Sequence, residues 1–217
     1  MLETLLAPVD LYCERTDASL WSEPVNLLTN LVFLVVGLAG VAMARRNDAG
    51  LFAEVLAWWI VVIGIGSAAF HMFANRATVV ADVLPIATLV LAMTIFALRR
   101  MFGFSWPITL LLFFGFYAAA GLLTWSVPNW LREATNGSTG YLAAFVGLPL
   151  FGGVLAARGH PAGRYFLAAF AVFCLALVFR SIDEDVCASL PLGTHFLWHL
   201  FNGTMLGILI VAIARHG

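Results

Sequence analysis

Two histidines stand four residues apart in the segment THFLWHLFNG, residues 194–203, which is otherwise largely apolar. Residues at positions i and i+4 share one face of an α-helix, so His195 and His199 can direct both rings to one point. A single helix can give two ligands to one metal ion by this spacing. The spacing alone is a weak signal, because a lone histidine on an apolar face is more often a packing residue.

Further polar residues accompany this pair. The segment GIGSAAFHMF carries Ser67 and His71, again four residues apart, and Asp82 follows eleven residues after His71. Isolated polar side chains in long apolar segments are costly and mark functional sites by default. Three neutral imidazoles form the ligand set of a catalytic zinc site whose fourth position is open to water. We therefore expect His71, His195 and His199 to bind zinc, with Ser67 and Asp82 beside the metal.

The composition places these residues in a membrane protein. Of the 217 residues, 62% are hydrophobic and 11% are charged, and the mean hydropathy is +0.97. Soluble domains are about half apolar and about a quarter charged. A membrane-spanning helix needs about 20 predominantly apolar residues. Such runs predict seven spans, at about residues 27–44, 51–73, 78–98, 106–124, 139–157, 163–180 and 194–213.

The seven predicted spans fill almost the entire chain, and their connections are short. Consecutive helices should therefore be antiparallel neighbours. We predict an all-α integral membrane bundle in which residues 1–217 form one domain. All 11 basic residues are arginines, seven on one side of this topology and four on the other. The positive-inside rule then puts the N-terminus outside and the C-terminus in the cytoplasm.

Other functions could use the same residues. A non-catalytic seven-helix receptor or transporter could use the histidines as a proton relay, which requires no metal. A structural zinc site would need a fourth protein ligand, for which Asp82 is the obvious candidate. A serine hydrolase would pair Ser67 with His71 as its base, but a ring that ligates zinc cannot also be that base. A retinal protein is excluded, because its Schiff base needs a lysine and the chain has none.

Four segments together resemble the alkaline ceramidase family of seven-helix membrane hydrolases: YCERTDASLWSEPVNLLTN at 12–30, GSAAFH at 66–71, DVLP at 82–85 and HFLWH at 195–199. The resemblance implies hydrolysis of a membrane lipid amide, in ceramide or a related N-acyl lipid, with no nucleic-acid partner. It gives Asp82 the proton transfer and Ser67 the stabilisation of the oxyanion. Both roles agree with the chemistry of a carboxylate and a hydroxyl beside zinc. The same site could also cleave another N-acyl lipid or an ester.

The N-terminal segment carries four carboxylates within fourteen residues: Asp10, Glu14, Asp17 and Glu23. A solvated acidic loop is the ordinary interpretation of such a cluster, although hard oxygen ligands also suit Ca²⁺. The resemblance implies calcium in this segment, with Glu14 and Glu23 as the best matches. The match is imperfect, because Leu11 and Thr16 stand where an acid and an amide are expected. Asp10 or Asp17 would then have to substitute.

One of the three cysteines lies within a predicted span, and the other two lie outside the spans. Cys174 lies within a span and is expected to pack there, whereas Cys13 and Cys187 lie in segments on the predicted outer side. An oxidising compartment would permit a disulfide between these two, and the resemblance implies this pairing. Two free thiols are the alternative if the topology is inverted.

Overall fold

The computed structural model describes residues 2–217, and its architecture is all-α. Seven helical segments within this range are long and apolar enough to cross a membrane, which confirms the predicted fold class. They are α2 (Pro24–Thr29) with α3 (Leu31–Arg46), α4 (Leu51–Phe73), α5 (Arg76–Phe96) with a π-helical extension (Ala97–Met101), α6 (Trp106–Ser126), η2 (Ser138–Tyr141) with α8 (Leu142–Ala157), α9 (Ala162–Ser181) and α10 (His195–His216). The connecting segments contain the short helices α1 (Leu2–Leu5), α7 (Asn129–Ala134) and η3 (Glu184–Val186).

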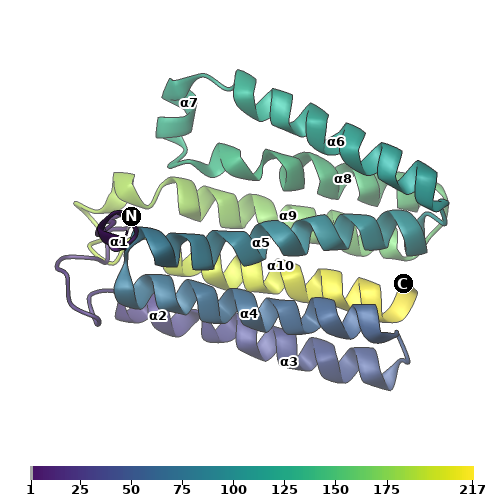
Figure 1. The fold of residues 1–217 in the computed structure, drawn as a ribbon, viewed down its shortest axis with the longest axis horizontal. Coiled ribbons are helices and arrows are strands. Elements are labelled where there is room, and N and C mark those ends of the chain that lie inside the picture. Colours follow the sequence, from purple (N-terminus) through teal and green to yellow (C-terminus); the bar gives the residue numbers. More distant parts are fainter. Residues whose placement is uncertain (1) are drawn as a thin grey trace.

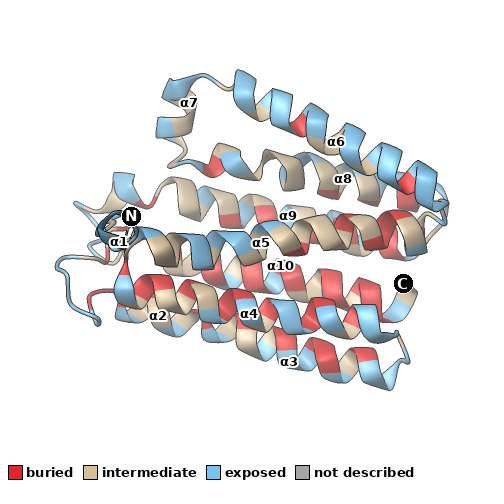
Figure 2. Cartoon of the chain, viewed as in Figure 1, coloured by how far each residue is buried: buried red, intermediate tan, exposed pale blue. Residues whose placement is uncertain are grey.

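Consecutive spans alternate in direction, and the chain begins and ends at opposite ends of the bundle (Figure 1). The last helix, α10, packs against α9 and α3. Buried residues make up 56% of the most apolar stretch of α10. They make up only 11% of that of α6, which lies at the outer edge of the bundle (Figure 2). The core is formed by large apolar side chains: Phe33, Leu56, Ile60, Leu89, Leu155 and Phe173. The histidine pair thus lies on the helix that the bundle encloses most.

A tight turn joins α4 to α5. Ala74 takes a left-handed conformation, with φ 38°, directly after α4. The Asn75 side chain accepts the backbone N–H of Thr78 at 3.0 Å, and the Thr78 hydroxyl accepts the backbone N–H of Asn75 at 3.1 Å. This reciprocal capping box satisfies donors that the first turn of a helix leaves free. It fixes the direction in which α5 leaves the end of α4, close to His71.

The two helices approach closely near the middle of the predicted site. Pro85 lies inside α5 and has no N–H to donate to the Ala81 carbonyl one turn earlier. That carbonyl faces α4, where a Cβ built on Gly66 would lie 2.1 Å from the Ala81 oxygen. Only glycine fits this contact. It sets Ser67 and Asp82, the next residue on each helix, at one level of the bundle.

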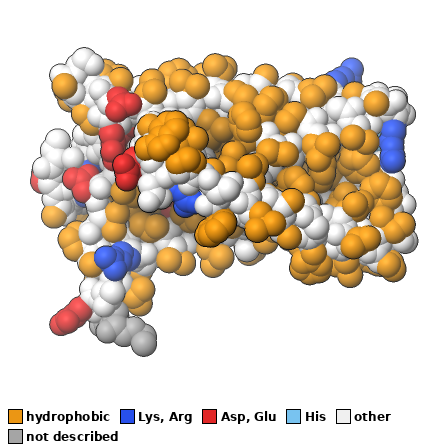
Figure 3. Space-filling model, turned by 90° about the horizontal axis from the view of Figure 1, so that it is seen from above, with side chains coloured by type: hydrophobic (Ala, Val, Ile, Leu, Met, Phe, Trp, Pro, Cys, Tyr) orange, Lys and Arg blue, Asp and Glu red, His pale blue; other side chains and the backbone are white. Residues whose placement is uncertain are grey.

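Large apolar side chains cover the flank of the bundle, whereas acidic side chains gather at the end that carries the N-terminus (Figure 3). Leu51, Leu111 and Trp125 are 77%, 73% and 82% exposed. An apolar surface of this extent is compatible with lipid rather than with water. The fold is therefore that of a multi-pass membrane protein.

Candidate metal centre

Two helices bring three histidines together near one end of the bundle. His71 lies at the end of α4, and His195 and His199 lie in the first two turns of α10. All three are buried, and each can offer a ring nitrogen within 4.8 Å of the others. The Nε2 atoms of His71 and His199 are 3.2 Å apart. Within residues 2–217, this is the only such cluster found that could hold a metal ion.

Hydrogen bonds on the outer side of two rings determine which nitrogens face the centre. The Glu23 carboxylate accepts the Nδ1–H of His71 at 2.5 Å, and the Thr29 hydroxyl lies 2.9 Å from Nδ1 of His199. Both rings therefore turn Nε2 inward. Partners of this kind orient metal-ligating histidines and raise their basicity.

The ring of His195 has a free nitrogen, unlike the other two rings. Nδ1 of His195 is buried and has no hydrogen-bond partner among the described residues. A buried, unpaired polar atom costs free energy and needs an explanation such as a bound ligand. Three imidazoles, one of them with an unsatisfied nitrogen, fit the ligand chemistry of a metal ion such as zinc.

The Tyr12 ring stacks on His195 from the N-terminal segment. The two ring centroids are 3.5 Å apart, and the rings are inclined by 18°. Burial raises the pKa of the Tyr12 hydroxyl above its usual value, so Tyr12 remains neutral. The stack fixes the plane of the one histidine ring that has no hydrogen bond on Nδ1.

A carboxylate from the preceding loop holds the first turn of α10. One oxygen of Asp183 accepts the backbone N–H groups of Thr194 at 2.6 Å and His195 at 2.8 Å, and the other accepts that of Cys13 at 3.1 Å. Gly193 precedes this turn with φ 65°, and a Cβ on it would lie 2.2 Å from the Asp183 carboxylate. Asp183 is buried and satisfies the free donors at the helix N-terminus. His195 is thereby positioned through its backbone.

Ser67 on α4 and Asp82 on α5 each follow a residue of the close contact between the two helices. Ser67 is buried one turn before His71. A Cβ on Gly66 would also lie 3.5 Å from the backbone nitrogen of Asp82, and Asp82 is partly buried. The structure places Ser67 one turn from His71 and Asp82 on the neighbouring helix, while their catalytic roles remain predictions.

Arg180 contributes a cation from the end of α9. Its guanidinium lies 5.4 Å from the Tyr141 ring centroid and 5.9 Å from that of Trp198. Its NH1 group donates to the Ser138 hydroxyl at 3.1 Å. Arg180 thus joins η2, α9 and α10 through its contacts with Tyr141, Ser138 and Trp198.

A disulfide joins Cys13 to Cys187 across 174 residues, which confirms the predicted pairing. Together with the hydrogen bond from Cys13 to Asp183, it fixes the N-terminal segment to the loop before α10. The remaining thiol, that of Cys174, is free and half-buried in α9. The segment that carries Tyr12 is therefore held over the histidines covalently.

Glu14 uses both of its carboxylate oxygens to hold the start of α2. Its two oxygens accept the backbone N–H groups of Val25 at 2.6 Å and Asn26 at 2.7 Å, at the N-terminus of α2. Burial raises the pKa of Glu14, and these two hydrogen bonds oppose that rise. Glu14 thus acts as a cap for the first membrane span.

The other three N-terminal acidic residues have different surroundings. Glu23 is bound to His71 and to Arg15, whereas Asp10 and Asp17 are exposed. Burial would raise the pKa of Glu23, but the hydrogen bond from His71 and the ion pair with Arg15 lower it below its usual value. The placement of these residues does not support the predicted calcium site.

The fold and the histidine cluster together define a multi-pass membrane protein with a candidate metal centre at one end of its bundle. The family model described as Ceramidase matches residues 11–216, nearly the entire chain. The chain therefore belongs to the ceramidase family, whose name implies amide hydrolysis. This match confirms the resemblance drawn from the sequence. A search of curated proteins returns no match.

Proposed function

We propose that this chain is a zinc-dependent hydrolase that cleaves the amide of ceramide, or of a related N-acyl lipid, to a fatty acid and a long-chain amine. The observation that carries the proposal is the buried cluster of His71, His195 and His199. Glu23 and Thr29 orient two of these rings, as expected for metal ligands. Family membership supports the reaction class.

The residues around the cluster divide the chemistry between them. Zinc, when bound, activates water for attack on a carbonyl group and polarises that carbonyl. Asp82 would take a proton from the attacking water and hand it to the leaving nitrogen. Ser67 would donate its hydroxyl hydrogen to the oxygen that develops negative charge. The water thus supplies OH to the acyl carbon and H to the amine.

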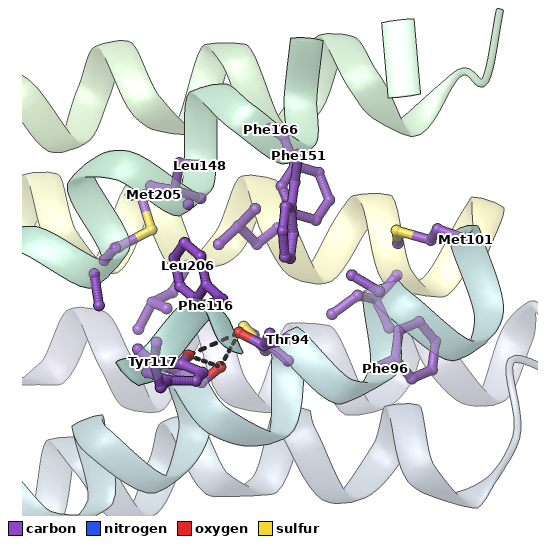
Figure 4. Close-up of a pocket in the computed structure, with 18 residues that line it drawn as sticks. Thr94, Phe96, Met101, Phe116, Tyr117, Leu148, Phe151, Phe166, Met205 and Leu206 are labelled. Atoms are coloured by element: carbon purple, nitrogen blue, oxygen red, sulfur yellow. Dashed lines mark hydrogen bonds between the residues drawn. The ribbon is translucent and has the colours of Figure 1, made fainter. Parts of the chain in front are cut away.

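An apolar pocket between α5, α6, α8, α9 and α10 suits the acyl chain of the substrate. Its lining is hydrophobic except at Thr94 and Tyr117, whose hydroxyls lie 2.9 Å apart and satisfy each other (Figure 4). Met205 and Leu206 line it six and seven residues after His199 on the same helix, which is about 10 Å along the helix axis. A lipid whose amide lay at the histidines could extend its chain toward this pocket.

We also propose that the histidine end of the bundle faces the outside and that the C-terminus is cytoplasmic. The Cys13–Cys187 disulfide lies at the histidine end, and disulfides persist in oxidising compartments. Arginine pairs end α3 and the π-helical extension of α5 at the opposite end, at residues 45–46 and 99–100. A C-terminal fusion to green fluorescent protein should fluoresce, and the same fusion to alkaline phosphatase should be inactive. The reverse pattern would invert this topology.

The activity can be tested on the detergent-purified, metal-replete protein. Ceramides, other N-acyl lipids and matched esters would be incubated with wild type and with His199→Ala, and the products measured by mass spectrometry. We expect equal amounts of fatty acid and long-chain amine with wild type and neither with the variant. Wild-type protein that holds zinc and cleaves none of these lipids would contradict the proposal and favour a structural zinc site.

A further inference from the structure

Arg15 lies beneath the surface of the N-terminal segment, next to the metal centre. Its side chain is only 7% exposed, and that of Glu23 only 1%. Nε of Arg15 donates to the Glu23 carboxylate at 2.5 Å. NH2 donates to the backbone carbonyl of His71 at 2.9 Å, and NH1 donates to that of Asp17 at 3.1 Å. One guanidinium therefore ties together the N-terminal segment, the start of α2 and the end of α4.

This guanidinium neutralises a carboxylate that is otherwise costly to bury. Glu23 uses one oxygen for His71 and the other for Arg15. A buried carboxylate without a paired cation is strongly destabilising. Arginine is always charged, and its planar fork can serve several oxygens at fixed angles. Arg15 thus holds the Glu23 carboxylate in place against His71.

The oxygens around Arg15 are of the kind that calcium prefers. They are one carboxylate oxygen and two backbone carbonyl oxygens, and calcium binds such ligands in flexible loops. Here the guanidinium already holds all three, and both oxygens of Glu14 are engaged by backbone N–H groups. A calcium ion beside Glu23 would also lie against the positive charge of Arg15, which is repulsive. The residues present do not fit the calcium ion that the resemblance implies.

We propose that Arg15 replaces a divalent cation in this chain: it is a positioning residue that holds Glu23 against His71, so the histidine site needs no calcium. The proposal rests on the proposed function for the identity of the metal at the histidines. Zinc affinity should therefore depend on Arg15 and be independent of calcium.

The test measures zinc affinity by competition with a chromophoric chelator, for wild type, Arg15→Ala, Arg15→Lys and the control Arg76→Ala. Arg76 is exposed, lies at the same end of the bundle and has no side-chain hydrogen bond among the described residues. Loss of an outer partner of a metal-ligating histidine typically weakens metal binding about 10–100-fold. We expect a loss of this size for Arg15→Ala, a smaller one for Arg15→Lys, which keeps the charge, and none for Arg76→Ala. Adding calcium, or removing it with a calcium-selective chelator, should change neither the wild-type zinc affinity nor its thermal midpoint.

Two results would overturn the proposal. One is a wild-type protein whose zinc affinity or thermal midpoint rises with calcium, and the other is a folded Arg15→Ala variant with wild-type zinc affinity. If Arg15→Ala does not fold, Arg15→Lys and the calcium titration of wild type still decide the question. Because zinc binding is measured without a lipid, failure to hydrolyse lipid amides would refute the proposed function and leave this inference intact.

Discussion

The Glu23 carboxylate lies 2.5 Å from Nδ1 of His71, and both side chains are buried. This contact links the segment before the first span to a histidine at the end of the second. It determines that His71 turns Nε2 toward His199. The orientation of the His71 ring in the metal centre therefore depends on a residue that is distant in the sequence.

Glu23→Gln should weaken zinc binding while the protein still folds. Glutamine can accept the Nδ1–H of His71 but lacks the charge that raises the basicity of the ring, and such losses are about 10–100-fold in metal affinity. Chelator competition measures the change, with Asp10→Asn, an exposed carboxylate of the same segment, as the control. Equal zinc affinity in Glu23→Gln and wild type would show that the contact does not support the metal.

Ser67→Ala should retain zinc and lose activity. If the Ser67 hydroxyl stabilises the oxyanion, turnover should fall about 10²–10³-fold. Ser126→Ala is a matched control, because Ser126 is an exposed serine that ends α6 and donates to the carbonyl of Leu123. Lipid turnover and zinc content would be measured on the same preparations. An unchanged rate in Ser67→Ala would remove this role.

Asp82→Asn separates a catalytic zinc site from a structural one. As the proton carrier, Asp82 is required for turnover but not for binding of the metal, so the variant should lose nearly all activity and keep most of its zinc. A structural zinc ion would use Asp82 as its fourth ligand. Release of zinc from Asp82→Asn, measured by elemental analysis, would therefore favour the structural site.

Gly66→Ala should destabilise the protein through the contact between α4 and α5. The added Cβ would lie 2.1 Å from the Ala81 carbonyl oxygen, and forced overpacking typically costs about 1–3 kcal/mol. Gly115→Ala is the control, since a Cβ there meets no atom within 4 Å. Thermal unfolding in detergent should show a lower midpoint for Gly66→Ala alone. A midpoint equal to that of wild type would mean that the helices separate there without cost.

The membrane spans could be predicted from the sequence because their signal is local. A run of about 20 apolar residues is sufficient to identify a spanning helix, and all seven runs are helices in the structure. The same criterion cannot find the break between α2 and α3 or the π-helical extension after Phe96. The break lies at Asn30 and the extension contains Arg99 and Arg100, but run length carries no information on the backbone hydrogen-bonding pattern that defines these elements.

The histidine cluster could be predicted in part, because some of its signal is also local in the sequence. The i, i+4 spacing of His195 and His199 is local, whereas His71 was predicted to join them because three neutral imidazoles form the ligand set of a catalytic zinc site, and the fold now shows it beside them. The partners of the rings gave no such signal. Thr29 and Tyr12 are ordinary residues in sequence, and only the tertiary structure brings them to His199 and His195.

The carboxylates of the N-terminal segment show where a cluster in sequence misleads. Four acidic residues within fourteen are compatible with a shared cation as well as with a solvated loop, and the resemblance implied calcium. In the fold, Glu14 caps α2 and Glu23 pairs with Arg15. The cation beside Glu23 was present in the same segment as an arginine, and its role became visible only through its contacts.

Metal content is the measurement that tests this mechanism most directly. Elemental analysis of the purified protein would be run beside the double variant His195→Ala/His199→Ala. We predict about one zinc ion per chain in wild type, as for a three-histidine catalytic site, and none in the variant. Wild-type protein that holds no zinc after preparation with the metal in excess would contradict the hydrolase mechanism, and the histidines would then have to act as a proton relay or as packing residues.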